Sequence, residues 1–438
     1  MRRPHSGQAL VVMLALLAGM LGAFALVLNA GVLVNDKMRL TNAADAAAYS
    51  AAQWQARSLN YQAYLNRAMV ANEVAIAQLV SLRSWSRYIE TTTGNASRVA
   101  QFIPPLAAPM RALAVGWNRI DTVIGNTIPP LESGLSRWNG AVLATSQAVA
   151  HVQAPLAAAD LVTQVARLNE PRAQVSAATR LLQARNGEAW LNRFTTRYQR
   201  GSGDLRRFST LLMNSRDGFS RSRRSDLPVQ LGLVSLPRRG GTDLLGEYSW
   251  RALDTLSLHV DLLLGEVETP IGWGAAENRR QVVSQSGDHG GSRRRNPRAS
   301  RLALRLLRPA TGYTGVPEIR DVVNPAARDT RSLTYSVALD LPRDAIQSVD
   351  RLLMPLGIAV VDGPPEPVNP DLAGDALHAI GSAEVYFQRP EARADGREEY
   401  PSLFSPYWQA RLAPTPAVTR QAIATYRGLG LDPFAVLP

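Results

Sequence analysis

The chain contains no cysteine, and its only lysine is Lys37. Without thiols it can form no disulfide, no thiolate metal site and no cysteine nucleophile. Without a lysine after position 37, the rest of the chain has no P-loop lysine, no Schiff-base lysine and no Ser-Lys dyad. Composition alone therefore excludes several large classes of enzyme.

Familiar catalytic motifs are also missing. The sequence has no G-x-S-x-G nucleophile elbow, no H-E-x-x-H zinc motif and no G-x-x-x-x-G-K-[ST] phosphate loop. The five histidines are scattered along the chain, at His5, His151, His259, His289 and His378. No spacing among them is typical of a metal centre.

One pair could begin a metal site. His259 and Asp261 lie in a predicted strand, where alternate residues point to the same face. Zinc or iron needs three or four protein ligands, so a half-buried polar face explains the pair more simply. We therefore expect no catalytic residue, no cofactor-binding residue and no metal ligand, and we expect that the protein is not an enzyme.

An uncharged apolar run from Ala9 to Val34 follows Arg2 and Arg3. A spanning helix needs about 20 apolar residues, so the run predicts a retained transmembrane helix. A cleaved export signal is the alternative, because Ala23-Phe24-Ala25 is a small-x-small cleavage pattern that would leave Leu26 at the mature N-terminus. The positive-inside bias predicts a cytoplasmic N-terminus and a body on the far side of the membrane.

Small residues form a stripe along this helix. Ala15, Gly19 and Ala23 are four residues apart, as are Ala18 and Gly22. Such a stripe lets two membrane helices approach closely. The alternative is that alanine and glycine are simply frequent in this run.

The sequence of the first half of the body predicts helices. Residues 40–57 are rich in alanine and contain neither glycine nor proline. An amphipathic helix is expected next, ending before a loop at 91–95. Its expected buried face is Tyr61, Leu65, Ala68, Asn72, Ala75, Leu79 and Leu82, with Gln62, Asn66, Glu73, Gln78 and Ser81 between them. Further helices are expected at about 96–126, 131–170 and 172–199, interrupted by Pro104-Pro105, Pro129-Pro130 and Pro171.

The sequence of the second half of the body predicts strands. Apolar and polar residues alternate at 255–268, 301–307, 332–341 and 382–390. The expected fold class is α+β: a single N-terminal transmembrane helix continues into an elongated helical region, and a β-rich C-terminal domain follows.

Arginine is concentrated in two stretches, Arg200–Arg224 and Arg279–Arg308, which are also rich in serine and glycine. Such runs are typical of solvated flexible loops. Contact with anionic lipid headgroups or an acidic partner is the alternative. The expected divisions are a cytoplasmic N-terminus 1–8, a transmembrane helix 9–34, a helical neck and stalk or bundle 35–200, a basic loop-rich connection 201–250, and a mixed α/β periplasmic domain 251–438 with a basic flexible loop at 279–300.

The N-terminus carries a family resemblance. Ser6-Gly7-Gln8-Ala9, the apolar run and LVNDKMRLTNAADAAAYSAA at 33–52 resemble the N-terminal module of the TadE/TadG-like proteins of bacterial tight-adherence (Tad, or Flp) pilus assembly. The most specific part is N-A-A-D-A-A-A at Asn42–Ala48, directly after the membrane helix. The resemblance covers roughly the first 55 residues.

The resemblance implies a bacterial inner-membrane protein with a periplasmic body, a non-catalytic structural part of the pilus assembly and secretion apparatus. Its implied partners are the inner membrane, other Tad/Flp pilus-assembly proteins, pseudopilins and a second copy of the chain, and not nucleic acid. Two features depart from relatives. Pilin-like cleavage after Gly7 would place Val12 at the fifth position of the mature chain, where a glutamate is usual. The D-x-S-x-S metal motif that some relatives carry in a von Willebrand A domain does not occur in this sequence.

In the expected mechanism, Ala15, Gly19 and Ala23 pack the membrane helix against another helix, and the neck at Asn42–Ala52 continues that contact above the bilayer. A secreted or membrane-tethered periplasmic hydrolase with an unrecognised active site is one alternative. A periplasmic sensory or scaffold protein is the other.

Overall fold

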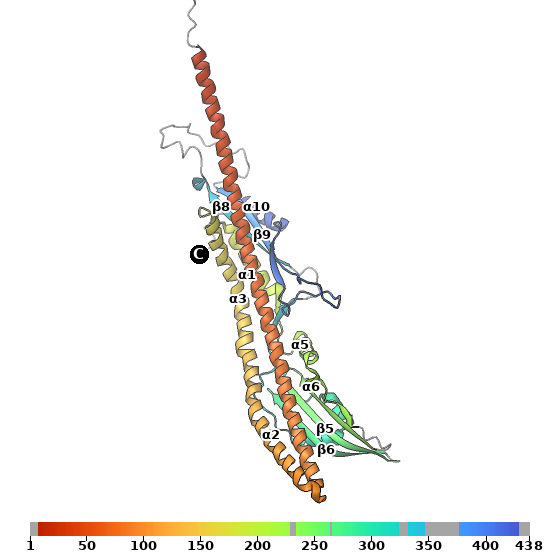
Figure 1. The fold of residues 1–438 in the computed structure, drawn as a ribbon. Helices are drawn as coiled ribbons and strands as arrows, with labels where there is room; N and C mark the ends of the chain where they lie inside the picture. The colour runs from red at the N-terminus through yellow and green to blue at the C-terminus, as the bar shows by residue number, and fades with distance from the viewer. Residues whose placement is uncertain (1–7, 228–233, 263–264, 324–331, 347–375, 429–438) are drawn as a thin grey trace, which may run out of the picture.

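The structure, a computed structural model, describes residues 8–227, 234–262, 265–323, 332–346 and 376–428. It is elongated along one helix, α1 (Gln8–Ala100), as Figure 1 shows. At 1.5 Å per residue this helix is about 140 Å long. Its N-terminal part projects beyond the body, and the other elements lie along the remainder. The predicted α+β class, with a long apolar N-terminal helix and a sheet-rich C-terminal part, is confirmed.

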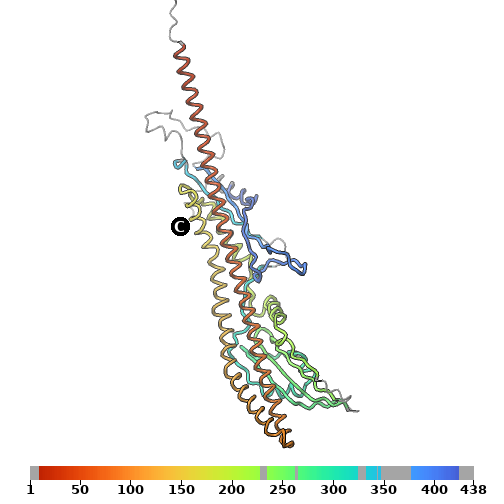
Figure 2. The backbone as a smooth tube through the Cα atoms, in the orientation of Figure 1, coloured from red at the N-terminus to blue at the C-terminus, as the bar shows by residue number. Residues whose placement is uncertain are grey.

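A second helical segment runs back along α1. It consists of α2 (Pro104–Arg137), the π-helical η1 (Trp138–Ala144) and α3 (Thr145–Asn169), and it ends near the base of the projecting part (Figure 2). The predicted loop at 91–95 is wrong, because α1 continues through it. The predicted break at Pro129-Pro130 is also wrong, because α2 runs through both prolines. Burial of Ile128 before the prolines and of Glu132 and Ser136 after them compensates for the backbone hydrogen bonds that the prolines remove.

In the described part of the chain, three antiparallel sheets lie along α1. The proximal sheet, nearer the projecting end, has the strand order β1-β8-β9-β10, and the distal sheet has the order β3-β4-β5-β6. Strands β2 and β7 form a separate pair. The bounds are β1 Gln174–Val175, β2 Thr195–Arg197, β3 Ser225–Leu227, β4 Val234–Leu245, β5 Ser249–Leu262, β6 Gly265–Arg279, β7 Arg320–Val322, β8 Ser332–Pro342, β9 Ala376–Phe387 and β10 Trp408–Leu412.

Shorter helices connect these strands. They are α4 (Ala177–Glu188), η2 (Ala189–Phe194), α5 (Gly203–Ser215), α6 (Gly218–Arg221), η3 (His289–Gly291), α7 (Ser292–Arg295), α8 (Pro297–Arg305), η5 (Arg343–Ala345) and α10 (Ala417–Gly428). The predicted strand at 301–307 is wrong, because most of it lies in α8. Ala299, Ser300 and Ala303 are buried, a spacing of helical rather than alternating type.

Both four-stranded sheets touch the backbone of α1. A Cβ atom added at Gly381 in β9 would lie 2.3 Å from the carbonyl carbon of Ala44, and one at Gly274 in β6 would lie 2.1 Å from the carbonyl oxygen of Ser84. At the proximal contact, α1 presents fully buried small residues: Ala43, Ala44, Ala47, Ala48, Ala51 and Ala52. The N-A-A-D-A-A-A segment is therefore the surface on which the proximal sheet rests.

Side chains of the helices complete the edges of both sheets. The Thr91 hydroxyl accepts a hydrogen bond from the backbone N–H of Trp273 in β6 at 2.9 Å and donates to the carbonyl of the same residue. The Thr179 hydroxyl likewise accepts a hydrogen bond from the backbone N–H of Ala338 in β8, at 2.7 Å, and donates to the carbonyl oxygen of that residue. These threonines occupy backbone groups that an exposed edge strand would otherwise offer to another chain.

The face of α1 that packs inward differs from the predicted one. Gln62, Asn66, Glu73 and Ser81 were expected to face solvent, yet all are fully buried, whereas Tyr61 is 46% exposed. The prediction holds for Leu65, which is buried, and for Gln78, which is exposed, and it fails for the buried polar residues because several elements surround the helix and use its polar groups. Asn66, for example, donates to the carbonyl oxygens of Arg320 at 2.9 Å and Leu403 at 2.7 Å.

Replacing either contact glycine should destabilise the body. We expect Gly381→Ala and Gly274→Ala each to lower the free energy of unfolding by about 1–3 kcal/mol, the usual cost of forcing extra atoms into a packed core. Gly116→Ala in α2 is the matched control, because nothing lies within 4 Å of its added methyl. This control should raise stability by about 0.5–1 kcal/mol through helix propensity. Urea unfolding of the three variants measures the difference, and equal effects would contradict the close contact.

Candidate functional site

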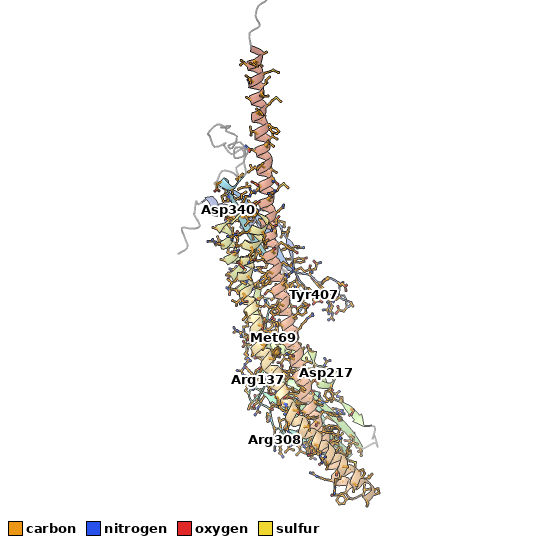
Figure 3. All side chains as sticks on the ribbon, turned by 60° about the vertical axis from the view of Figure 1, so that its left-hand side comes forward. Met69, Arg137, Asp217, Arg308, Asp340 and Tyr407 are labelled. Carbon is orange, nitrogen blue, oxygen red and sulfur yellow. The ribbon has the colours of Figure 1, made fainter. Side chains whose placement is uncertain are left out.

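The projecting part of α1 is the first candidate site. Among the described residues, α1 is the one helix long and apolar enough to cross a membrane, and its most apolar window is not buried by the body. Figure 3 shows the side chains of this part projecting freely on all sides. Leu10, Leu17 and Leu26, for example, are each at least 58% exposed. An exposed apolar helix of this length fits single-pass membrane anchoring.

The small-residue stripe lies on an open surface. A Cβ atom added at Gly19 or Gly22 would meet nothing within 4 Å. Ala15 and Ala23 are also exposed. Within the described part of the chain, nothing covers the stripe, so it is free to receive another helix.

Charged groups fasten α1 to the body where the apolar run ends. Asp36 is buried and pairs with Arg172 at 2.7 Å, and the Arg172 Nε atom lies 2.8 Å from Glu170. Hydrogen bonds to Glu170 and Asp36 raise the pKa of Arg172 above its ordinary value. The next residue, Lys37, donates to the carbonyl oxygen of His378 in β9. This junction was not predicted from the sequence. The signal that could have indicated it is the pair Asp36 and Lys37, the first charged residues after the uncharged run.

Most of the neck is buried against other elements of the same chain. Its alanines pack against the proximal sheet and α3, so the predicted contact of Asn42–Ala52 with a partner is wrong for most of the segment. Asn42 and Tyr49 remain exposed. Asp45 is partly buried, and this burial raises the pKa of its carboxyl group. Only a narrow part of the neck therefore faces outward.

A buried carboxyl group joins α1 to the distal sheet. Glu73 Oε2 accepts hydrogen bonds from Trp250 Nε1 at 2.9 Å and the Tyr313 hydroxyl at 2.7 Å, and Oε1 accepts one from Asn139 at 3.1 Å. Burial raises the pKa of Glu73 to about 7, and these neutral donors offset only part of the cost of removing the charge from water. Since its acceptors are occupied by other side chains, the group fastens α1 to its neighbours.

The histidines lie apart. His259, the candidate metal ligand, has Nδ1 2.8 Å from Glu266 and Nε2 2.9 Å from Asn296, so its neighbours come from β6 and the start of α8. Burial lowers the pKa of His151 to about 3, and this neutral ring stacks on Trp190 with 5.3 Å between centroids. Within the described ranges, no group of three or more His, Asp or Glu side chains is placed to hold a metal ion. His259 and Asp261 are not joined by further ligands.

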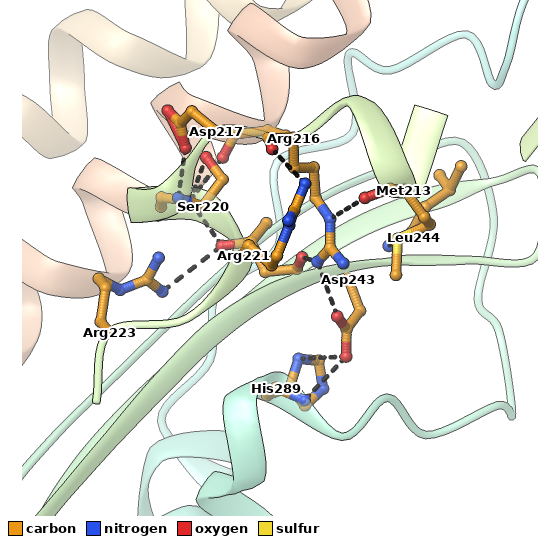
Figure 4. A network of polar contacts seen from close by, with 12 residues as sticks. Met213, Arg216, Asp217, Ser220, Arg221, Arg223, Asp243, Leu244 and His289 are labelled. Carbon is orange, nitrogen blue, oxygen red and sulfur yellow. Dashed lines mark hydrogen bonds and ion pairs between the residues drawn. The ribbon is translucent and has the colours of Figure 1, made fainter. Parts of the chain in front are cut away.

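The two arginine-rich stretches meet in a polar network, drawn in Figure 4. Arg216 pairs with Asp243 Oδ1 at 3.0 Å, and Asp243 Oδ2 accepts the backbone N–H of His289 at 2.7 Å. Burial lowers the pKa of His289 to about 4, so its ring is neutral at physiological pH. The stretch 279–300, expected as a flexible basic loop, thus contains fully buried residues, among them His289 and Asn296.

Glu73 should give stability a defined pH dependence. Between pH 4.5 and 7 the carboxyl is ionised in the unfolded chain and protonated in the folded one, so the folded state binds one more proton. Stability contributed by this group should fall with rising pH across that window, by up to about 1.4 kcal/mol per pH unit, and level off above it. We expect Glu73→Gln to remove this slope. Thermal unfolding of both proteins from pH 4 to 8 measures it as a difference curve, and parallel curves would refute it.

One comparison with known proteins concerns this site. Residues 7–54 match the family model described as "Putative Flp pilus-assembly TadE/G-like". No curated protein and no solved structure matches the chain. The matched residues are the membrane helix and the neck as far as Trp54, so the resemblance based on N-A-A-D-A-A-A is confirmed. Residues 7–54 are therefore similar to the TadE/G-like Flp pilus-assembly family.

Proposed function

We propose that this protein is a structural component of a Tad/Flp-type pilus assembly and secretion apparatus. Residues 9–34 anchor it in the bacterial inner membrane, with residues 1–8 in the cytoplasm and the body from residue 35 in the periplasm. The observation that carries the proposal is the coincidence of the family match at 7–54 with a helix that is bare over its apolar part and fastened to the body from Asp36.

The role is non-catalytic. Glu73, His151 and His289 have strongly shifted pKa values, and each is buried within the fold. A general acid or base must reach a substrate. The burial of these groups supports an architectural use of them.

The membrane helix is the proposed assembly surface. Gly19 and Gly22 stand open on α1, and small residues at four-residue spacing let a second helix approach to backbone contact. We propose that the occupant is the membrane helix of a pseudopilin, another Tad/Flp component or a second copy of the chain. Above the bilayer, the exposed neck residues Asn42 and Tyr49 lie about 140° and 120° around the helix axis from Gly19, so the proposed contact is confined to the membrane part of α1.

Filling the stripe should weaken assembly while leaving the body intact. Gly19→Leu places a bulky side chain on the proposed interface, and we expect recovery of crosslinked pilus-assembly proteins to fall at least fivefold. Gly31→Leu is the matched control: the same change on the same helix, also with nothing within 4 Å, about 120° around the axis from Gly19. The measurement is crosslinking in intact cells followed by mass spectrometry of proteins co-purified from inner membranes.

Two results would contradict the proposal. Equal recovery with Gly19→Leu and Gly31→Leu would remove the stripe as the interface. A mature N-terminus at Leu26, found by mass spectrometry of the same sample, would mean that the segment is a discarded signal.

A further inference from the structure

Helix α8 covers the face of the distal sheet that is turned away from α1. Asp254 in β5 accepts a hydrogen bond from Ser84 of α1 at 2.7 Å, whereas the hydroxyl of its neighbour Thr255 accepts one from Asn296, just before α8, at 3.0 Å. Successive residues of a strand point to opposite faces, so α1 and α8 enclose the sheet between them. The outer side of α8 therefore faces away from the rest of the body.

That outer side is made of arginine. Arg298, Arg301 and Arg305 are exposed and lie three and four residues apart, so they share one face of the helix. Arg294 in α7 and Arg308 after α8 are also exposed and extend the row at both ends. We call these five residues the arginine face.

The charge of this face is poorly compensated. Arg305 and Arg308 make no hydrogen bond or ion pair within the described residues, and Arg301 contacts only the carbonyl oxygen of Pro297, at 3.3 Å. Arg298 donates to the carbonyl oxygen of Glu268, and among these five arginines only Arg294 has a carboxylate partner in the described ranges, Asp288 at 3.0 Å. The nearby carboxylate of Glu268 is occupied by the backbone N–H groups of Arg298 and Ala299, at 2.7 and 3.0 Å.

The backbone under these arginines is held in place. Asn296 is fully buried and donates to the carbonyl oxygen of Pro237 at 2.9 Å, while Glu268 binds the first turn of α8. A solvated charge run has no such anchors. The helix backbone that carries the arginine face is thus preorganised, so binding has to order the arginine side chains but not the backbone beneath them.

The face is remote from the proposed membrane anchor. Where α1 meets β6, at Thr91, the helix has run about 85 Å beyond Val34. Figure 3 likewise shows Arg308 far from the projecting end. Because salt screens charges beyond about 10 Å, headgroups of the anchoring bilayer are out of reach. This step rests on the proposed function.

We propose that the arginine face docks an acidic protein segment, with carboxylates spaced along it. Arginine forks bind carboxylates bidentately, and the row offers several at helical spacing. Leu306, 66% exposed between Arg305 and Arg308, adds an apolar contact typical of a protein interface. A second copy is a poor complement, because the chain has a net charge of +12.

The test uses the full chain in detergent, so that binding is measured independently of membrane insertion and pilus assembly. The probe is a fluorescent helical peptide with glutamates at three- and four-residue spacing beside a leucine stripe. We expect Arg298→Gln/Arg301→Gln/Arg305→Gln to weaken its Kd at least tenfold and Leu306→Ser about threefold. Arg111→Gln/Arg119→Gln/Arg167→Gln is the matched control, because it removes the same charge from exposed arginines of α2 and α3 and should change the Kd less than twofold.

Each other outcome would overturn the proposal. An equal loss of peptide affinity in the two triple variants would mean that binding depends on the net charge of the chain and not on the arginine face. Tighter binding of inorganic polyphosphate than of the peptide, unaffected by Leu306→Ser, would identify a phosphate polymer as the partner. Tighter binding of vesicles of anionic phospholipid would identify a lipid surface. Unchanged circular dichroism and unfolding of each variant establish that the fold is intact.

Discussion

The structure depends on how closely two β-sheets can approach a single helix. Backbone-to-backbone contact requires that one partner carry only a small side chain and that the other lack Cβ where they cross. Ala44 meets Gly381 in this way at the proximal sheet, and Ser84 meets Gly274 at the distal sheet. The alanine-rich neck, which matches the family model, therefore has a packing role within this chain as well as its place next to the membrane. One helix can serve both sheets because these contacts lie at different heights along it.

Hydrogen bonding adds a second requirement at the same crossings. A helix that replaces a neighbouring strand must offer donors and acceptors to the strand edge, and α1 does so with threonine, serine and asparagine. Polar residues on α1 are consequently buried beside apolar ones such as Met69 and Ile76. This explains why helical periodicity predicted a helix here and yet placed buried polar residues such as Asn66 and Glu73 outside the interior face.

Local sequence signals were sufficient for part of the molecule. A long uncharged run, an alanine-rich segment, alternating strands and N-A-A-D-A-A-A predicted the long apolar N-terminal helix, the α+β class and the family match at residues 7–54. The continuation of α1 through 91–95, the passage of α2 through Pro129-Pro130 and the helical state of 301–305 were not predictable in this way, because packing against other elements decides them. The Glu73 site was equally hidden, since Trp250, Tyr313 and Asn139 come from distant parts of the chain.

The continuity of α1 has a mechanical consequence. A membrane helix that is joined to its body by a flexible linker transmits no orientation, whereas this one enters the body without a break and is clamped at Asp36. The apolar N-terminal part of α1 and the body therefore change orientation together. A tilt of about 20°, common for membrane helices, would displace a point 85 Å along the helix sideways by roughly 30 Å. Small changes in how the helix sits in the bilayer thus become large movements at the far end of the molecule.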